Sequence, residues 1–79
     1  MIKIEDYKIK IIALDHNNNP YNGKKDISML EAAIKNYYKL FGILPSLKNQ
    51  FVINENDPFI LDGIWFNNYR KEIEFLLRT

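Results

Sequence analysis

The stretch that decides the fold lies near the start of the chain and reads Tyr7-Lys8-Ile9-Lys10-Ile11-Ile12-Ala13-Leu14. Apolar side chains recur at every second position from Tyr7 to Ala13, with lysines between the first of them. Because successive side chains of a strand point to opposite faces of a sheet, this pattern predicts a half-buried strand. The alternation of Ile2 and Ile4 is out of phase with it. We expect a bulged extension of the same strand there, with a separate short strand as the alternative.

Turn-forming residues separate this strand from the next element. Residues 15–26 contain several asparagines together with Pro20 and Gly23, which are residues that favour turns. Ser28 and Glu31 then match a capping box, in which each side chain accepts a hydrogen bond from the backbone amide of the other residue. A helix is therefore predicted to begin at Ser28.

An apolar stripe with helical spacing follows the capping box. It consists of Leu30, Ala33, Ile34, Tyr37 and Phe41. Gly42 suits the left-handed position after a helix, and Pro45 prevents the helix from resuming. The sequence thus predicts a helix over residues 28–41 with this stripe in the core.

The next part of the chain predicts more strands. Residues 50–54 read Gln-Phe-Val-Ile-Asn, which is typical of a second strand. Asp62-Gly63 stands between two apolar triplets, a strong signal for a hairpin over residues 58–66. Asp57 followed by Pro58 could instead begin a helix, but that helix would be apolar around most of its circumference. We therefore favour the hairpin.

The end of the chain predicts a second helix. From Asn67 or Asn68 onward, Tyr69, Ile73, Leu76 and Leu77 recur at helical spacing. The order of elements predicts a single α+β domain over residues 1–79, a small antiparallel sheet of two to four strands with two helices packed on one face.

Composition limits the classes of function. The 79 residues are 47% hydrophobic and 14% aromatic, which indicates a folded core, and the formal net charge is only +1. Such a charge gives no strong overall attraction to nucleic acid or to an anionic membrane. The chain has no cysteine, no apolar run long enough to span a bilayer, and a charged start unlike a signal peptide. These features predict a cytoplasmic protein without a membrane partner.

One loop resembles a calcium site in its spacing only. Oxygen-bearing side chains occupy calcium-loop positions at Asp15, Asn17, Asn19 and Asp26. Pro20, however, stands where such a loop requires glycine, and its φ is fixed at negative values. We expect no metal and no cofactor.

Catalytic chemistry is not indicated either. His16 is the only side chain whose ordinary charge changes near neutral pH. Neither serine lies in a recognisable nucleophile motif, and no acidic pair has the spacing of a general acid and base. We predict that the protein is not an enzyme and has no catalytic residues.

Exposed aromatic and basic side chains are the best functional candidates. Aromatic residues and arginine dominate many binding interfaces, and two aromatics that are adjacent on a helix cannot both face the core. The predicted partner-binding residues are Tyr38, Trp65, Tyr69, Arg70, Lys24 and Lys25. They indicate a non-enzymatic protein–protein interaction module, and the low-GC bias of the sequence suggests a phage or mobile-element inhibitor of a host protein. The alternative is a small nucleic-acid-binding or regulatory protein, and a homodimer is compatible with either.

Overall fold

The fold is seen in a computed structural model that describes residues 3–53 and 58–79. Along the chain come the short 3-10 helix η1 (Ile4–Asp6), strand β1 (Lys8–Leu14), helix α1 (Lys24–Phe41), and strands β2 (Gln50–Val52), β3 (Pro58–Asn67) and β4 (Glu72–Arg78). The predictions made for Ile2 and for the end of the second strand at Asn54 lie outside the described residues.

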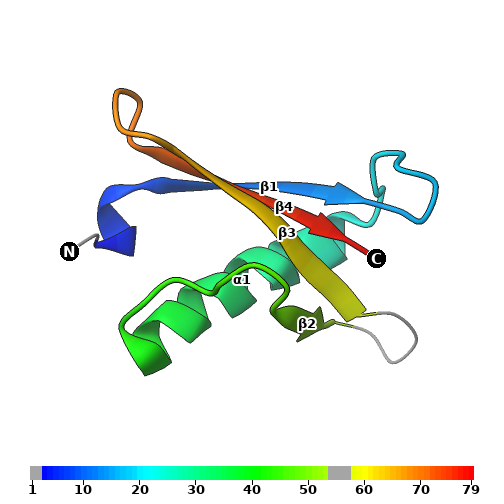
Figure 1. The fold of residues 1–79 in the computed structure, drawn as a ribbon, viewed down its shortest axis with the longest axis horizontal. Helices are drawn as coiled ribbons and strands as arrows, with labels where there is room; N and C mark the ends of the chain where they lie inside the picture. Colours follow the sequence, from blue (N-terminus) through cyan, green and yellow to red (C-terminus); the bar gives the residue numbers. More distant parts are fainter. Residues whose placement is uncertain (1–2, 54–57) are drawn as a thin grey trace.

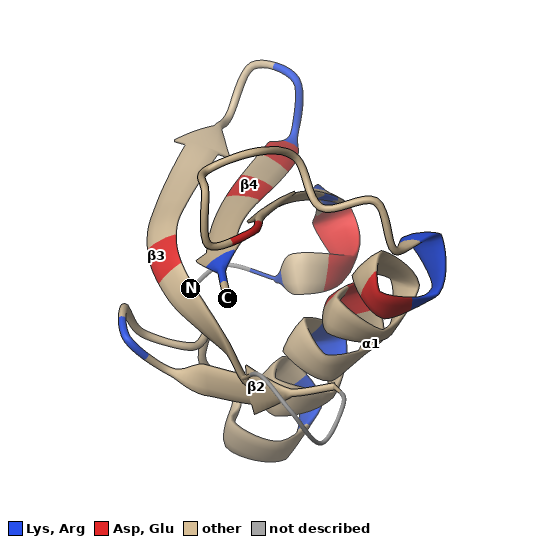
Figure 2. Cartoon of the chain, turned by 90° about the vertical axis from the view of Figure 1, so that its right-hand side faces the viewer, with Lys and Arg blue, Asp and Glu red and all other residues tan. Residues whose placement is uncertain are grey.

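The strands form one four-stranded sheet in the order β1-β4-β3-β2. β1 and β4 are parallel, whereas β4 with β3 and β3 with β2 are antiparallel. α1 lies against one face of this sheet and leaves the other face without a covering layer among the described residues (Figure 1, Figure 2). The prediction of an antiparallel sheet with two helices is therefore wrong, because the α+β fold has one α-helix and a mixed sheet.

β1 confirms the strand predicted from the alternating stretch. Ile9, Ile11 and Ala13 face the core, and Lys8 and Lys10 lie on the opposite face of the sheet. The parallel register places these lysines opposite Glu72 and Glu74 of β4, and Lys10 Nζ lies 3.6 Å from Glu74 Oε1. Opposite charges on neighbouring strands favour this register over its alternatives.

β4 stands where the sequence predicted a second helix. The helix was predicted from the spacing of Tyr69, Ile73, Leu76 and Leu77. An alternating pattern is also present at Ile73, Phe75 and Leu77, and the side chains of this second set are fully buried in the core. Leu76 lies on the other face of the sheet, and its apolar character obscured the alternation. The strand prevails because it hydrogen-bonds to β1 on one side and to β3 on the other, which a helix could not do.

β3 passes straight through the pair that predicted a hairpin turn. Its register with β4 shifts between Leu61 and Gly63, so Asp62 is the extra residue of a β-bulge. Neither Asp62 nor Gly63 has the positive φ that a type I′ turn requires. Because the bulge shifts the alternation by one residue, Phe59 and Leu61 before it and Ile64 after it all face the core.

α1 begins at Lys24, one turn earlier than predicted. Gly23 is its N-cap and has no side chain to cap the helix, so the predicted Ser28 capping box is wrong. Asp26 lies in the first turn, where a negative charge suits the positive end of the helix dipole, and its Oδ2 accepts a 2.6 Å hydrogen bond from Tyr21 Oη. The start of the helix is thus stabilised by the charge of Asp26 and by its hydrogen bond to Tyr21 in the preceding loop.

The predicted end of the helix is confirmed. Gly42 has φ +70° and donates its amide hydrogen to the carbonyl of Tyr38, as a left-handed C-cap does. At the other end of the chain, η1 rather than a bulged strand carries Ile4, which is only 7% exposed. The prediction of an extended conformation at Ile4 is therefore wrong.

The core lies between α1 and the inner face of the sheet. Leu30 and Ile34 of α1 belong to one buried cluster with side chains from all four strands. The cluster comprises Ile4, Ala13, Leu30, Ile34, Phe51, Phe59, Leu61, Ile73, Phe75 and Leu77. Each large side chain buried here contributes about 1.5–3 kcal/mol, so the layer between helix and sheet supplies most of the apolar stabilisation.

The corrected start of α1 changes the expected effect of Ser28→Ala. Because Ser28 is exposed within the helix, alanine should leave the free energy of unfolding unchanged or raise it by up to about 0.5 kcal/mol. Urea denaturation of the two proteins measures the difference, and Leu30→Ala, which should cost about 2–5 kcal/mol, calibrates the assay. A loss near 1 kcal/mol for Ser28→Ala would show that this serine caps the helix after all.

Candidate functional site

The six predicted partner-binding residues fall on two different parts of the molecule. Trp65, Tyr69 and Arg70 belong to the hairpin of β3 and β4, and Tyr69 at its turn is 98% exposed. Asn67 Oδ1 accepts a 2.9 Å hydrogen bond from the amide of Arg70, which stabilises this turn. The three hairpin residues are therefore exposed, but they form only half of the predicted set.

The other three predicted residues lie on α1. Lys24 and Lys25 are exposed in its first turn, and Tyr38 is half-buried near its end. At 1.5 Å per residue, Lys25 and Tyr38 are separated by about 20 Å along the helix. The structure therefore does not bring the six residues together as one site.

Trp65 lies on the outer face of the sheet, opposite Glu74, and is 52% exposed. Its indole covers Gly63, which is two residues earlier on the same face, and a Cβ at Gly63 would overlap with the indole. This close approach explains why glycine occupies the bulge. The indole is thus partly used to cover the backbone of β3, which reduces the aromatic surface left for a partner.

Gly63→Ala tests this arrangement, because the added methyl group should push the indole away from the strand. As Trp65 is the only tryptophan, its fluorescence emission should shift to longer wavelength as the ring becomes more hydrated. The side chain can rotate, so the free energy of unfolding should fall by only about 1 kcal/mol. An unchanged emission spectrum would mean that the indole does not lie over residue 63.

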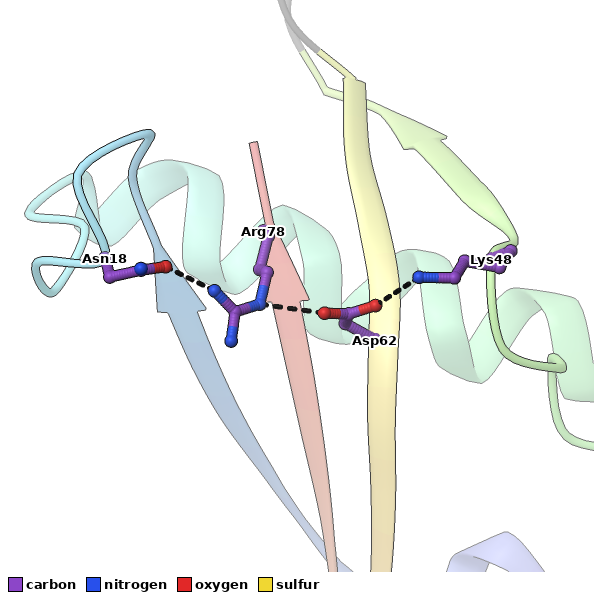
Figure 3. Close-up of polar contacts among 4 residues, drawn as sticks. All are labelled: Asn18, Lys48, Asp62 and Arg78. Carbon is purple, nitrogen blue, oxygen red and sulfur yellow. Dashed lines mark hydrogen bonds and ion pairs between the residues drawn. The ribbon is translucent and has the colours of Figure 1, made fainter.

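A row of polar side chains crosses the outer face at the other end of the sheet (Figure 3). Arg78 bridges Asn18 Oδ1 and Asp62, with Arg78 Nε 2.8 Å from Asp62 Oδ2. Lys48 Nζ donates to Asp62 Oδ1 at 2.6 Å. This row joins two loops to β3 and β4, and its single anion, Asp62, pairs with both of its cations.

Asp62 is the central anion of this row. The hydrogen bond from Lys48 is the main cause that holds the pKa of Asp62 below its usual value; desolvation opposes it, and the charges of Lys48 and Arg78 lower the pKa further. Each charged side chain of the row therefore has a partner within the chain. We assign it a structural role rather than a binding role.

The lowered pKa predicts how stability should depend on pH. The ion pairs of Asp62 stabilise the fold at every pH above the ordinary carboxyl pKa, and this contribution is lost as the pH falls through the lowered value. Asp62→Asn should therefore lower the melting temperature at neutral pH, and the difference from the parent should shrink in acid. Asp6→Asn is the control, because Asp6 is exposed and forms no ion pair within residues 3–53 and 58–79. A difference that stays constant with pH would contradict the assignment.

The loop that resembled a calcium site is organised by its own backbone. Asp15 Oδ1 accepts 2.9 Å hydrogen bonds from the amides of Asn17 and Asn19, and Asn18 adopts φ +63°. This is an ordinary turn in which the first candidate ligand is already engaged. His16 is exposed on the same turn.

Another set of exposed apolar side chains lies in the last turn of α1 and in the segment that follows it, up to Leu47. We call this group the apolar end, and it comprises Leu40, Phe41, Ile43 and Leu47, which are between 56% and 78% exposed. Phe41 was expected in the buried stripe, and that expectation is wrong. Leu44 and Pro45 turn inward instead, so the neighbouring apolar residues point away from the core.

The apolar end was missed although the sequence contained a signal for it. Leu40 and Phe41 are adjacent in the helix. Adjacent side chains point in different directions, so both cannot face the core together with the buried stripe. The predicted helix was extended to Phe41 correctly, but the helix outlasts the part of the sheet that could cover its last turn (Figure 1). Phe41 still packs against Tyr37, and the centroids of the two rings lie 4.6 Å apart.

A cleft of about 520 Å³ lies beside the last turns of α1. One wall consists of Ile4, Glu5 and Tyr7, from η1 and the residue after it. The other wall is one face of α1, where positions spaced by three and four residues bring together Lys35, Tyr38, Lys39 and Gly42. The cleft and the apolar end thus occupy the same end of the helix, and Tyr38 is the one predicted residue that reaches it.

Comparisons with protein family models, curated proteins and solved structures find no match to this chain. No helix in the described part of the chain is long and apolar enough to cross a membrane. Functional inference therefore depends on the side chains themselves.

Proposed function

We propose that this protein is a small, non-enzymatic protein-binding module whose interface is the apolar end of α1. The observation that carries the proposal is the exposure of Leu40, Phe41, Ile43 and Leu47 within a few residues of one another. Single exposed apolar residues are normal, but several large ones at one end of a small domain are typical of a protein interaction site. An inhibitor of a host protein would be a module of this kind that covers the functional surface of its partner.

The exposed groups next to the apolar end suit recognition. Two lysines of α1, Lys35 and Lys39, lie in the last turns of the helix near Leu40 and Phe41, and Figure 2 colours the basic positions of α1 blue. An apolar centre with a polar rim is the usual composition of a protein interface. The hairpin residues Trp65, Tyr69 and Arg70 are a second exposed group, but Trp65 is partly engaged with Gly63.

The double variant Leu40→Ser/Phe41→Ser tests the proposal. Both side chains are mostly exposed, so the melting temperature should change little, whereas binding of the partner should weaken at least about tenfold. The partner is identified by a photo-reactive phenylalanine analogue placed at position 40, and its affinity is then measured with purified proteins. Val52→Ser/Tyr69→Ser is the matched control, because it also removes exposed apolar surface, but from other parts of the chain. Equal loss of affinity in both double variants would contradict the proposal.

A small nucleic-acid-binding or regulatory protein remains the second candidate, favoured by the lysines of α1. Binding to a single-stranded oligonucleotide would weaken steeply as salt rises, because each lysine–phosphate contact releases counterions. A partner held by the apolar end would keep most of its affinity under the same conditions.

A further inference from the structure

The cleft beside α1 has the dimensions of a binding site. Its volume of about 520 Å³ lies within the roughly 300–1,000 Å³ that is usual for ligand pockets. Ile4 and the half-buried ring of Tyr38 provide apolar walls. Gly42 leaves one end of the cleft open, because no atom lies within 4 Å of the position that a side chain would occupy there. A large apolar side chain can therefore enter from outside.

The charges at the cleft favour a negatively charged ligand. Lys39 forms no ion pair with any described residue, and Lys35 is 3.6 Å from Glu31 on the helix surface. Lys35 and Lys39 are also spaced as i and i+4, a like-charge pair that destabilises a helix slightly. Glu5 is the single acidic residue in the lining, so the lining carries a net charge of +1, with Lys39 as the cation that is not shared with Glu31.

We infer that the cleft binds a large apolar side chain of an acidic peptide segment in the partner protein. This inference shares one assumption with the proposed function, namely that the partner is a protein. The apolar side chain lies between Ile4 and Tyr38, and a flanking carboxylate pairs with Lys39. The apolar end continues this surface past Gly42, so one partner segment can contact both.

Amide chemical shifts of the full-length, isotopically labelled protein test the inference directly. The probe is acetyl-Asp-Asp-Phe-Asp-Asp-amide, and the expected result is saturable shifts in residues 4–7 and 35–42. The peptide with alanine in place of phenylalanine should bind about tenfold more weakly, because it lacks the buried side chain. The peptide with lysine in place of every aspartate should cause no saturable shift. Binding of the lysine peptide, or stronger binding of an oligothymidylate to the same residues, would overturn the inference.

Two variants of the cleft should change affinity in opposite directions. Lys39→Gln should weaken binding of the acidic peptide about threefold, and Glu5→Gln should strengthen it by a similar factor. Lys25→Gln is the matched control, since it removes the same charge from the same helix far from the cleft. If Lys25→Gln weakens binding as much as Lys39→Gln, the attraction is general and the cleft is not the site. If the peptide does not bind while Leu40→Ser/Phe41→Ser still weakens binding of the purified partner, the cleft inference fails and the proposed function stands.

Discussion

The structure depends on the position of β4, the last strand of the chain, at the centre of the sheet. β4 pairs with β1 in parallel and with β3 in antiparallel orientation, and its inner face places Ile73, Phe75 and Leu77 in the core. The sheet therefore joins the two ends of the chain, and without β4 it would separate into β1 and a β2–β3 pair. Such long-range pairing must be formed against the entropy of closing a long loop, and local contacts alone cannot assemble this core.

Because α1 covers only one face of the sheet, the outer face is exposed to water. It is made compatible with water by contacts inside the chain: Lys10 pairs with Glu74, Asp62 pairs with Lys48 and Arg78, and Trp65 covers the bulge at Gly63. The apolar end of α1 has no comparable compensation. Its side chains are exposed because the helix extends beyond the sheet, while Leu44 and Pro45 take the chain back to the core.

Local patterns allowed part of this fold to be predicted, and non-local pairing explains what they missed. β1 and the end of α1 at Gly42 follow from alternation and from left-handed capping, which are properties of a few neighbouring residues. β4 was mistaken for a helix because Leu76 is apolar although it lies on the outer face, which hides the alternation. The strand is favourable only because β4 pairs with β1 and β3, and these strands are distant in sequence or unseen in the local pattern. The Asp62-Gly63 pair favours a turn locally, but the phase shift from Leu61 to Ile64 is the pattern of a bulge. Among the site residues, exposure of Tyr69 and the lysines was predictable, whereas the cleft depends on how η1 meets α1, which no local pattern contains.

Some of the lysines of α1 are placed where they do not help the helix. Lys24 and Lys25 lie in the first turn, where the helix dipole disfavours positive charge, and Lys35 and Lys39 repel each other one turn apart. Lys39 alone suits the negative end of the dipole. Residues that oppose local stability without contributing to the core are typical of surfaces kept for recognition. Lys35 and Lys39 line the cleft, whereas Lys25 lies about 20 Å from Tyr38 along the helix, so only the first pair can meet a negatively charged partner bound there.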